Sequence, residues 1–170
     1  MLANGKVLSG RNAHRLHPAR LRLLGLVAAI EALRKELSPS GIAISLTHES
    51  VPPKLPPELT LCLFRIVQEA LQNAIKYSGA REVSVRIIGG GDALTVSIVD
   101  DGVGFDVDAT WDKGLGLISM NERLEAVGGT LEILATPGTG CRVTATVPLV
   151  LVSQPTRSSV QPRPKTMTAH

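Results

Sequence analysis

The stretch VSIVDDGVGFDVDA, residues 96–109, decides the fold because a core strand in it runs directly into a polar, glycine-rich segment. Its first residues alternate as in a half-buried strand, which ends at Asp100. An Asp-Gly turn would explain one glycine after the strand. Here Gly102 and Gly104 both follow, and two glycines let the backbone approach a flat or charged ligand and leave amides free. The stretch therefore indicates either an ordinary turn or a half-buried pocket in which Asp100 accepts a hydrogen bond from an amino group.

Helices and antiparallel strands are predicted on both sides of this stretch. Apolar residues with a helical period predict helices over 17–37, 57–78 and 117–127. Alternating apolar residues predict strands over 42–48, 81–88 and 93–100 and a hairpin over 130–149. The order of these elements predicts an α+β fold, a two-layer sandwich with helices on one face of a mixed, mostly antiparallel sheet.

Composition favours one soluble domain. Of the 170 residues, 44% are hydrophobic and only 2% are aromatic, so we expect an aliphatic core. Cys62 and Cys141 are far apart and lack the spacing of metal ligands, which favours a reduced, cytoplasmic compartment. No apolar run approaches the roughly 20 residues of a membrane helix.

The net charge of +3 is the sum of two basic ends and an acidic central region. Residues 1–22 and 151–170 hold eight basic residues and no acidic one, which leaves 10 basic against 15 acidic residues in 23–150. No aromatic residues are interleaved with the basic ones, so nucleic-acid binding is disfavoured. We expect a basic N-terminal segment over 1–22, one domain over 23–150, and a disordered, polar, proline-rich tail over 151–170.

The predicted helix 57–78 has an apolar arc and a polar face. The arc comprises Leu63, Ile66, Val67, Ala70, Leu71 and Ala74. On the other side Glu69, Asn73 and Lys76 follow one another by one turn each. A solvated face is the default interpretation of such residues, so the helix alone does not indicate chemistry.

A second glycine pair, Gly114 and Gly116, directly precedes the predicted helix 117–127. Free amides at a helix start form an anion site, although glycine before a helix has many uses. Neither glycine pair has the third glycine of a Rossmann fingerprint, and no Gly-Lys-Ser/Thr of a Walker A motif occurs. Five aspartates crowd residues 100–112, but their spacing does not fit a calcium loop.

Together these motifs resemble the ATP-binding catalytic domain of sensor histidine kinases, in the Bergerat-fold (GHKL) ATPase superfamily that includes DNA gyrase and a heat-shock chaperone. FRIVQEALQNAIKYSGA (64–80) is similar to the asparagine box of that family, and VDDGVGFD (99–106) to its first glycine box. GLGLISMNERLEAVGGTLEI (114–133) is similar to the second glycine box, and TPGTGCRVTATVPL (136–149) to the closing hairpin. HRLHPARLRLLGLVAAIEAL (14–33) resembles the join to the dimerisation helices in the nitrate-sensor-type subfamily.

The resemblance implies a role for each matching residue at the base and the metal. Asp100 would accept a hydrogen bond from the adenine amino group, while Gly102 and Gly104 would let the backbone pass close to the base and release a lid. Asn73 would coordinate Mg²⁺, which bridges the phosphates, as suits a cation that keeps most of its waters. Glu69 would orient or deprotonate the attacking group.

The resemblance also implies a phosphate site and a lid. Lys76 would face a phosphate as a point charge. Gly114, Leu115, Gly116 and Leu117 would surround the phosphates at the helix start. Residues 105–113 would form a short ATP lid, in which Trp111 is either a hydrophobic latch on a partner or a surface aromatic.

The sequence departs from the family pattern at three places. Tyr77 stands where relatives often have His, and Cys141 where many have Thr. No histidine has the context of a phosphoacceptor: His14 precedes Arg, His17 precedes Pro, and His48 lies in a predicted strand. The spacing of His14 and His17 could also suit zinc, but no third ligand is evident.

We therefore expect an ATP- and Mg²⁺-binding catalytic domain of a two-component sensor histidine kinase, which presents the γ-phosphate to a histidine outside this chain. Its expected partners are a histidine-bearing dimerisation domain and a response regulator, with no nucleic acid and no membrane contact. The chain would be monomeric, inactive as an autokinase alone, and cytoplasmic, as a free protein or as the cytosolic part of a membrane sensor. The alternatives are a serine kinase like the anti-sigma-factor kinases, acting as a nucleotide-gated binding module, and a degenerate scaffold.

Overall fold

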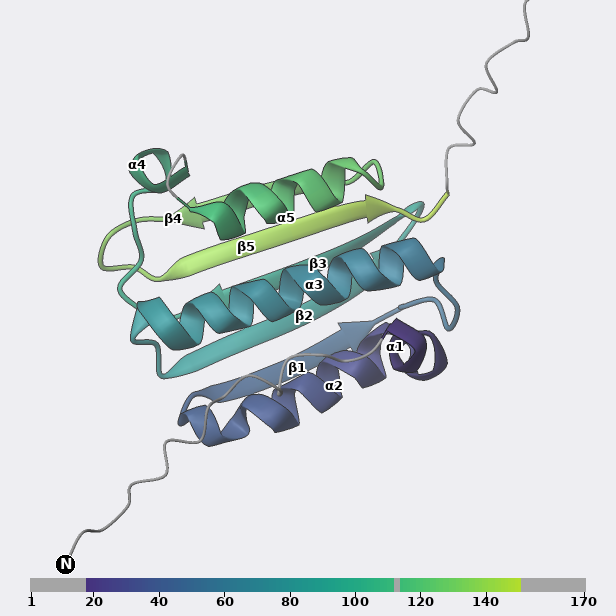
Figure 1. The fold of residues 1–170 in the computed structure, drawn as a ribbon, viewed down its shortest axis with the longest axis horizontal. Helices are drawn as coiled ribbons and strands as arrows, with labels where there is room; N and C mark the ends of the chain where they lie inside the picture. The colour runs from purple at the N-terminus through teal and green to yellow at the C-terminus, as the bar shows by residue number, and fades with distance from the viewer. Residues whose placement is uncertain (1–17, 112–113, 151–170) are drawn as a thin grey trace, which may run out of the picture.

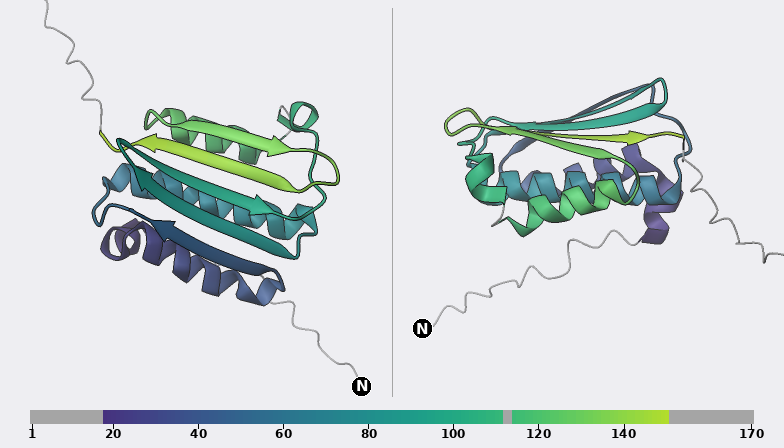
Figure 2. Two further views of the ribbon diagram at one scale, coloured as in Figure 1. Left: turned by 180° about the vertical axis from the view of Figure 1, so that it is seen from behind. Right: turned by 90° about the horizontal axis from the view of Figure 1, so that it is seen from above.

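The structure, a computed structural model, describes residues 18–111 and 114–150. It is a two-layer α+β sandwich, in which helices pack on one face of a five-stranded sheet (Figure 1). Seen along the sheet, the helical layer lies on one side only of the described part of the chain (Figure 2). The predicted fold class is confirmed.

The sheet has the strand order β1-β2-β3-β5-β4. The strands are β1 (Ala43–Glu49), β2 (Glu82–Gly90), β3 (Ala93–Asp100), β4 (Thr130–Ala135) and β5 (Cys141–Pro148). β1 is parallel to β2, and each of the other neighbouring pairs is antiparallel. The mixed, mostly antiparallel sheet is therefore confirmed, and β3 lies at its centre.

The helical layer consists of α1 (Pro18–Leu24), α2 (Leu26–Leu37), α3 (Pro57–Asn73) and α5 (Leu115–Glu125), while the short α4 (Val107–Trp111) lies at the end of the sheet (Figure 1). A 3₁₀ turn, η1 (Ser38–Ser40), follows α2, and a π-helical turn, η2 (Ala74–Ser78), follows α3. The helix α3 lies across the middle of the sheet, because this position buries its apolar arc, which extends from Leu63 to Ala74. Burial of such aliphatic side chains contributes about 1.5–3 kcal/mol each.

The predicted helix over 17–37 is two helices instead of one. Gly25 separates α1 from α2 with a φ of 76°, in the left-handed region that glycine adopts without strain. Leu23, placed on the apolar face by the periodicity, is therefore 86% exposed, while Leu21 is buried. The domain boundary expected after residue 22 falls inside α1.

Three other predicted elements differ in detail. The prediction treated 57–78 as one α-helix, but its last turn is the π-helical η2. Strand β2 continues through Gly90, so the turn to β3 uses Gly91, whose φ is 57°. The polar, glycine-rich segment after Asp100, in which no helix was predicted, contains α4.

Several predictions concern residues outside the described part. They concern the structure of the N-terminal residues 1–17, which include His14 and His17, and the structure of the tail 151–170. The side chain of Trp111 is also outside it. His48 lies in β1, as predicted. Within the described residues, no helix is both long and apolar enough to cross a bilayer.

Candidate functional site

A pocket of ≈ 550 Å³ lies between the helical layer and one end of the sheet. Its lining residues come from α3, η2, β3, the segment around α4, α5 and β5. They are Glu69, Ala70, Asn73, Ala74, Tyr77, Ser78, Ile98, Asp100, Gly104, Phe105, Thr110, Gly114, Leu115, Gly116, Leu117, Met120, Cys141 and Val143. The pocket therefore brings together most of the residues that the three sequence motifs had singled out.

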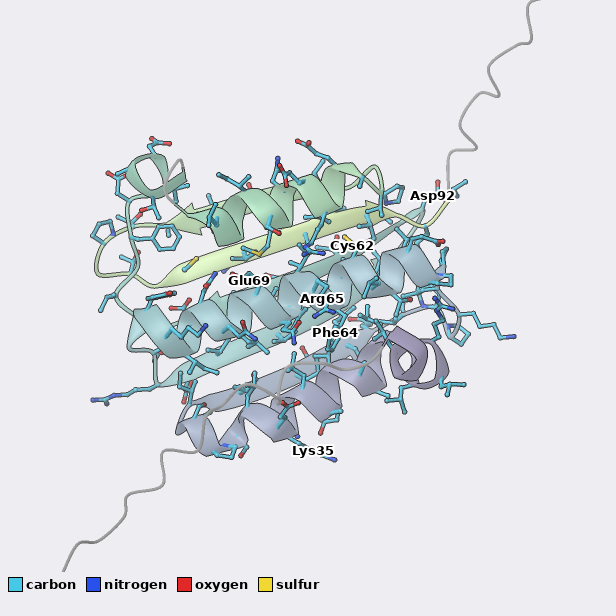
Figure 3. The ribbon with its side chains drawn as sticks, viewed as in Figure 1. Lys35, Cys62, Phe64, Arg65, Glu69 and Asp92 are labelled. Carbon is cyan, nitrogen blue, oxygen red and sulfur yellow. The ribbon has the colours of Figure 1, made fainter. Side chains whose placement is uncertain are left out.

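The polar face of α3 supplies Glu69 and Asn73. Both side chains are half-buried, and Glu69 lies on the side of α3 that faces α5 (Figure 3). A Cβ on Gly116 would collide with Glu69 Oε1 and lie 3.5 Å from Asn73 Nδ2. A side chain at position 116 would therefore displace the Glu69 carboxylate, and glycine leaves room for it beside α5.

Two predicted site residues, Lys76 and Gly102, do not line the pocket, and Tyr77 lines it instead of Lys76. The reason is the π-helical turn η2, which has more residues per turn than an α-helix. It places Tyr77, rather than Lys76, on the same side of the helix as Asn73. Lys76 is exposed, and the Tyr77 side chain, 75% exposed, lies at the rim of the pocket. Such π-turns are often found at functional sites.

Asp100 and Asp101 face different surroundings although they are adjacent. Asp100 Oδ1 accepts a hydrogen bond from the Gly102 amide (2.9 Å), and burial raises the pKa of this carboxyl above its ordinary value. Asp101 Oδ1 instead accepts the amides of Arg81 (2.8 Å) and Glu82 (3.0 Å), which lower its pKa. The first carboxylate therefore belongs to the pocket, while the second ties the end of β3 to the start of β2.

Asp100→Asn is expected to raise the melting temperature at neutral pH. Because the pKa of Asp100 is raised in the folded state, its ionised form costs folding free energy above that pKa. The cost disappears as the pH falls through the raised pKa, so the advantage of the variant should shrink in the same range. Thermal unfolding of both proteins at several pH values measures this. A variant less stable at neutral pH would show that the carboxylate is net stabilising.

The glycines after β3 are explained by close backbone packing within the protein. A Cβ on Gly102 would lie 2.5 Å from both Cβ and the carbonyl oxygen of Ser78. Gly104 has a φ of 63°, and a Cβ there would collide with the carbonyl oxygen of Thr136. Gly102 does not line the pocket; its contribution is the amide that holds Asp100.

The start of α5 offers fewer amides than its glycines suggest. The Gly114 amide already donates to the carbonyl oxygen of Thr110 (2.9 Å), and the Leu117 amide donates to the Gly114 carbonyl (3.0 Å). Leu115 and Gly116 supply the first amides of the helix, the class that helix starts leave unpaired. An anion at this end would bind to these two amides.

Several lining residues were not predicted as site residues from sequence. Thr110 and Phe105 lie in the segment treated only as a lid, and Cys141 and Tyr77 were noted only as departures from a pattern. Burial, with a smaller effect of the nearby Asp100 charge, raises the pKa of the Cys141 thiol to about 11. The thiol is therefore protonated at neutral pH, a neutral group beside the pocket carboxylate.

Comparison with known proteins gives consistent results. Residues 59–151 match the sequence model of the family described as histidine kinase-, DNA gyrase B- and HSP90-like ATPases. Over 134 residues, 79% of this chain, the sequence is 33% identical to the sensor protein VraS of Staphylococcus aureus (strain COL), of which that alignment spans only 38%.

Two solved structures share the fold. The histidine kinase domain of the Erythrobacter litoralis EL346 blue-light activated histidine kinase superimposes with a TM-score of 0.59 at 24% identity, over 73% of this chain and 65% of that one. The Acinetobacter baumannii histidine kinase AdeS gives 0.58 at 18% identity, over 71% and 61%. At these identities the likeness concerns the fold alone.

Proposed function

Since the chain belongs to the family of histidine kinase-, DNA gyrase B- and HSP90-like ATPases, we propose that its pocket binds ATP with Mg²⁺ and presents the γ-phosphate to a histidine supplied from outside these residues. The observation that carries the proposal is that one pocket combines polar groups from separate elements with apolar walls. It is lined by the half-buried Asp100 carboxylate at the end of β3 and by Glu69 and Asn73 beside the start of α5. Such a mostly apolar pocket with a few polar groups suits a base, a sugar and a phosphate chain.

Asp100 would select the base. A carboxylate held by the backbone amides of Gly102 and Cys141 would still accept a hydrogen bond from the exocyclic amino group of adenine, because each carboxylate oxygen has two lone pairs. Ile98, Met120 and Val143 give this part of the pocket apolar walls. The Tyr77 ring at the rim would cover the nucleotide from the solvent side.

Asn73 and Glu69 would serve the phosphate end. The amide oxygen of Asn73 is a hard ligand of the kind Mg²⁺ accepts, and a single protein ligand leaves room for phosphate oxygens and water. Mg²⁺, when bound, supplies neutralisation of phosphate charge. The Glu69 carboxylate lies beside Asn73, where it would orient the attacking imidazole or accept its proton. The amides of Leu115 and Gly116 would hold phosphate oxygens.

The match to a sensor protein favours a histidine kinase over the anti-sigma-factor-like serine kinase. We also propose the nitrate-sensor-type subfamily, from the join-like stretch 14–33, and a monomer that works with a histidine-bearing dimerisation domain and a response regulator. Mixing the protein with such helices and labelled ATP distinguishes the alternatives. Acid-labile label indicates phosphohistidine, whereas acid-stable label indicates phosphoserine.

Calorimetric titration of ATP and ADP, with and without Mg²⁺, tests nucleotide binding directly. We expect Mg²⁺ to strengthen ATP binding in the wild type, and Asn73→Ala to lose that increment because it removes the ligand oxygen. Gln72→Ala is the matched control, since Gln72 is the neighbour on α3 that does not line the pocket. Absence of binding by folded wild-type protein would contradict the proposal.

A further inference from the structure

The short helix α4 is held in place from three directions. Asp106 Oδ1 accepts the Ala109 amide (3.1 Å) and so caps its start. Val107 lines a groove of ≈ 320 Å³ on the sheet together with residues of β4, including Ile133 and Leu134. At its other end, the Thr110 carbonyl accepts the Gly114 amide (2.9 Å). The helix is therefore anchored to the sheet and to the start of α5 by contacts of the protein itself.

These anchors fix which residues of α4 face inward. Val107 and Thr110 are half-buried, while Asp108 and Ala109 between them are exposed. Val107 lines the groove on the sheet, and Thr110 lines the large pocket. Among residues 18–111 and 114–150 the Thr110 hydroxyl has no hydrogen-bond partner, and Thr110 forms part of the pocket wall.

Thr110 lies beside the start of α5. Its carbonyl is bonded to Gly114, and two residues further on Gly116 packs against Glu69 and Asn73. Thr110, Glu69, Asn73 and the first turn of α5 thus surround one region of the pocket.

We propose that Thr110 is a positioning residue that donates its hydroxyl proton to an oxygen of the terminal phosphate, so that the site distinguishes ATP from ADP. The proposal rests on the function proposed above, because it assumes that the phosphates lie beside Asn73. A hydroxyl on an anchored helix is well suited to this role. It adds a directed hydrogen bond to a charged oxygen without a charge of its own, and the anchors of α4 hold it in place before the nucleotide arrives.

Thr110→Val tests the proposal because valine keeps the β-branched shape and loses only the hydroxyl. In calorimetric titrations with Mg²⁺, we expect Thr110→Val to weaken ATP binding roughly tenfold and ADP binding less than about twofold. Thr110→Ser, which keeps the hydroxyl, should stay within about threefold of wild type for both nucleotides. Thr144→Val is the control, since Thr144 faces away from the helices on β5 and lies outside the pocket.

Equal losses for ATP and ADP in Thr110→Val, or no loss for either, would overturn the role at the terminal phosphate. Melting temperatures of the variants check that they are folded, and Thr110→Ala provides a second deletion of the hydroxyl if the valine disturbs α4. Wild-type protein that binds neither nucleotide would overturn the proposed function together with this inference. Wild-type binding with an unchanged ATP-to-ADP ratio in both hydroxyl deletions would overturn the inference alone.

Discussion

Replacing Asp100 with Asn is expected to weaken the binding of both ATP and ADP by roughly 100-fold, the loss of one to two hydrogen bonds to a charged group. Both nucleotides carry the same base, so the effect should not depend on the number of phosphates. The Asn side chain loses the charge and offers an NH₂ group that would face the adenine amino group, donor against donor. Calorimetry on wild type and variant measures the loss.

Asp101→Asn is the matched control for this experiment. It changes the adjacent carboxylate in the same way, but Asp101 accepts the amides of Arg81 and Glu82 and does not line the pocket. We expect nucleotide affinity within about threefold of wild type for this variant, since surface changes away from a site have small effects. If both variants lost binding equally, the carboxylate at Asp100 would not be the group that contacts the base.

The elements whose residues repeat with one period were predictable from sequence. The apolar arc of α3 and the alternation in β2 and β3 each specify a buried face, and the structure buries them as expected. The break at Gly25 was not predictable, because the helical period continues through it from Leu23 to Leu26. Exposed Leu23 shows that periodicity alone does not reveal a backbone break between two short helices.

The site was predictable in its motifs but not in its local geometry. Asn73 and Glu69 face the pocket because they lie at the edge of the buried arc, on the side of α3 toward α5. Lys76 and Tyr77 are both about one turn after Asn73 in the sequence, so either could lie on the same side of the helix as Asn73. The π-helical turn decides in favour of Tyr77, and the sequence did not predict that turn. Thr110 was not predicted as a site residue, because nothing in the sequence shows that a helix forms there with Val107 against the sheet.

The turn between β4 and β5 shows the same limit. Its sequence, TPGTG (136–140), contains two glycines that look alike, and both have positive φ, 87° at Gly138 and 79° at Gly140. Only the structure distinguishes them. A Cβ on Gly138 would meet nothing within 4 Å, whereas a Cβ on Gly140 would collide with the carbonyl oxygen of Asp100. Gly140 therefore sets how closely β5 approaches the pocket carboxylate.

Gly140→Ala is expected to destabilise the protein by about 3 kcal/mol or more, while Gly138→Ala should cost only about 1 kcal/mol. Both variants place a Cβ at a left-handed position, so their difference isolates the collision with the backbone of Asp100. Because Asp100 must move to relieve it, Gly140→Ala should also weaken nucleotide binding, and Gly138→Ala should not. Denaturant unfolding and nucleotide titration of the two variants measure both effects. Equal losses of stability would mean that the approach to Asp100 is not tight and that the shared backbone strain accounts for both.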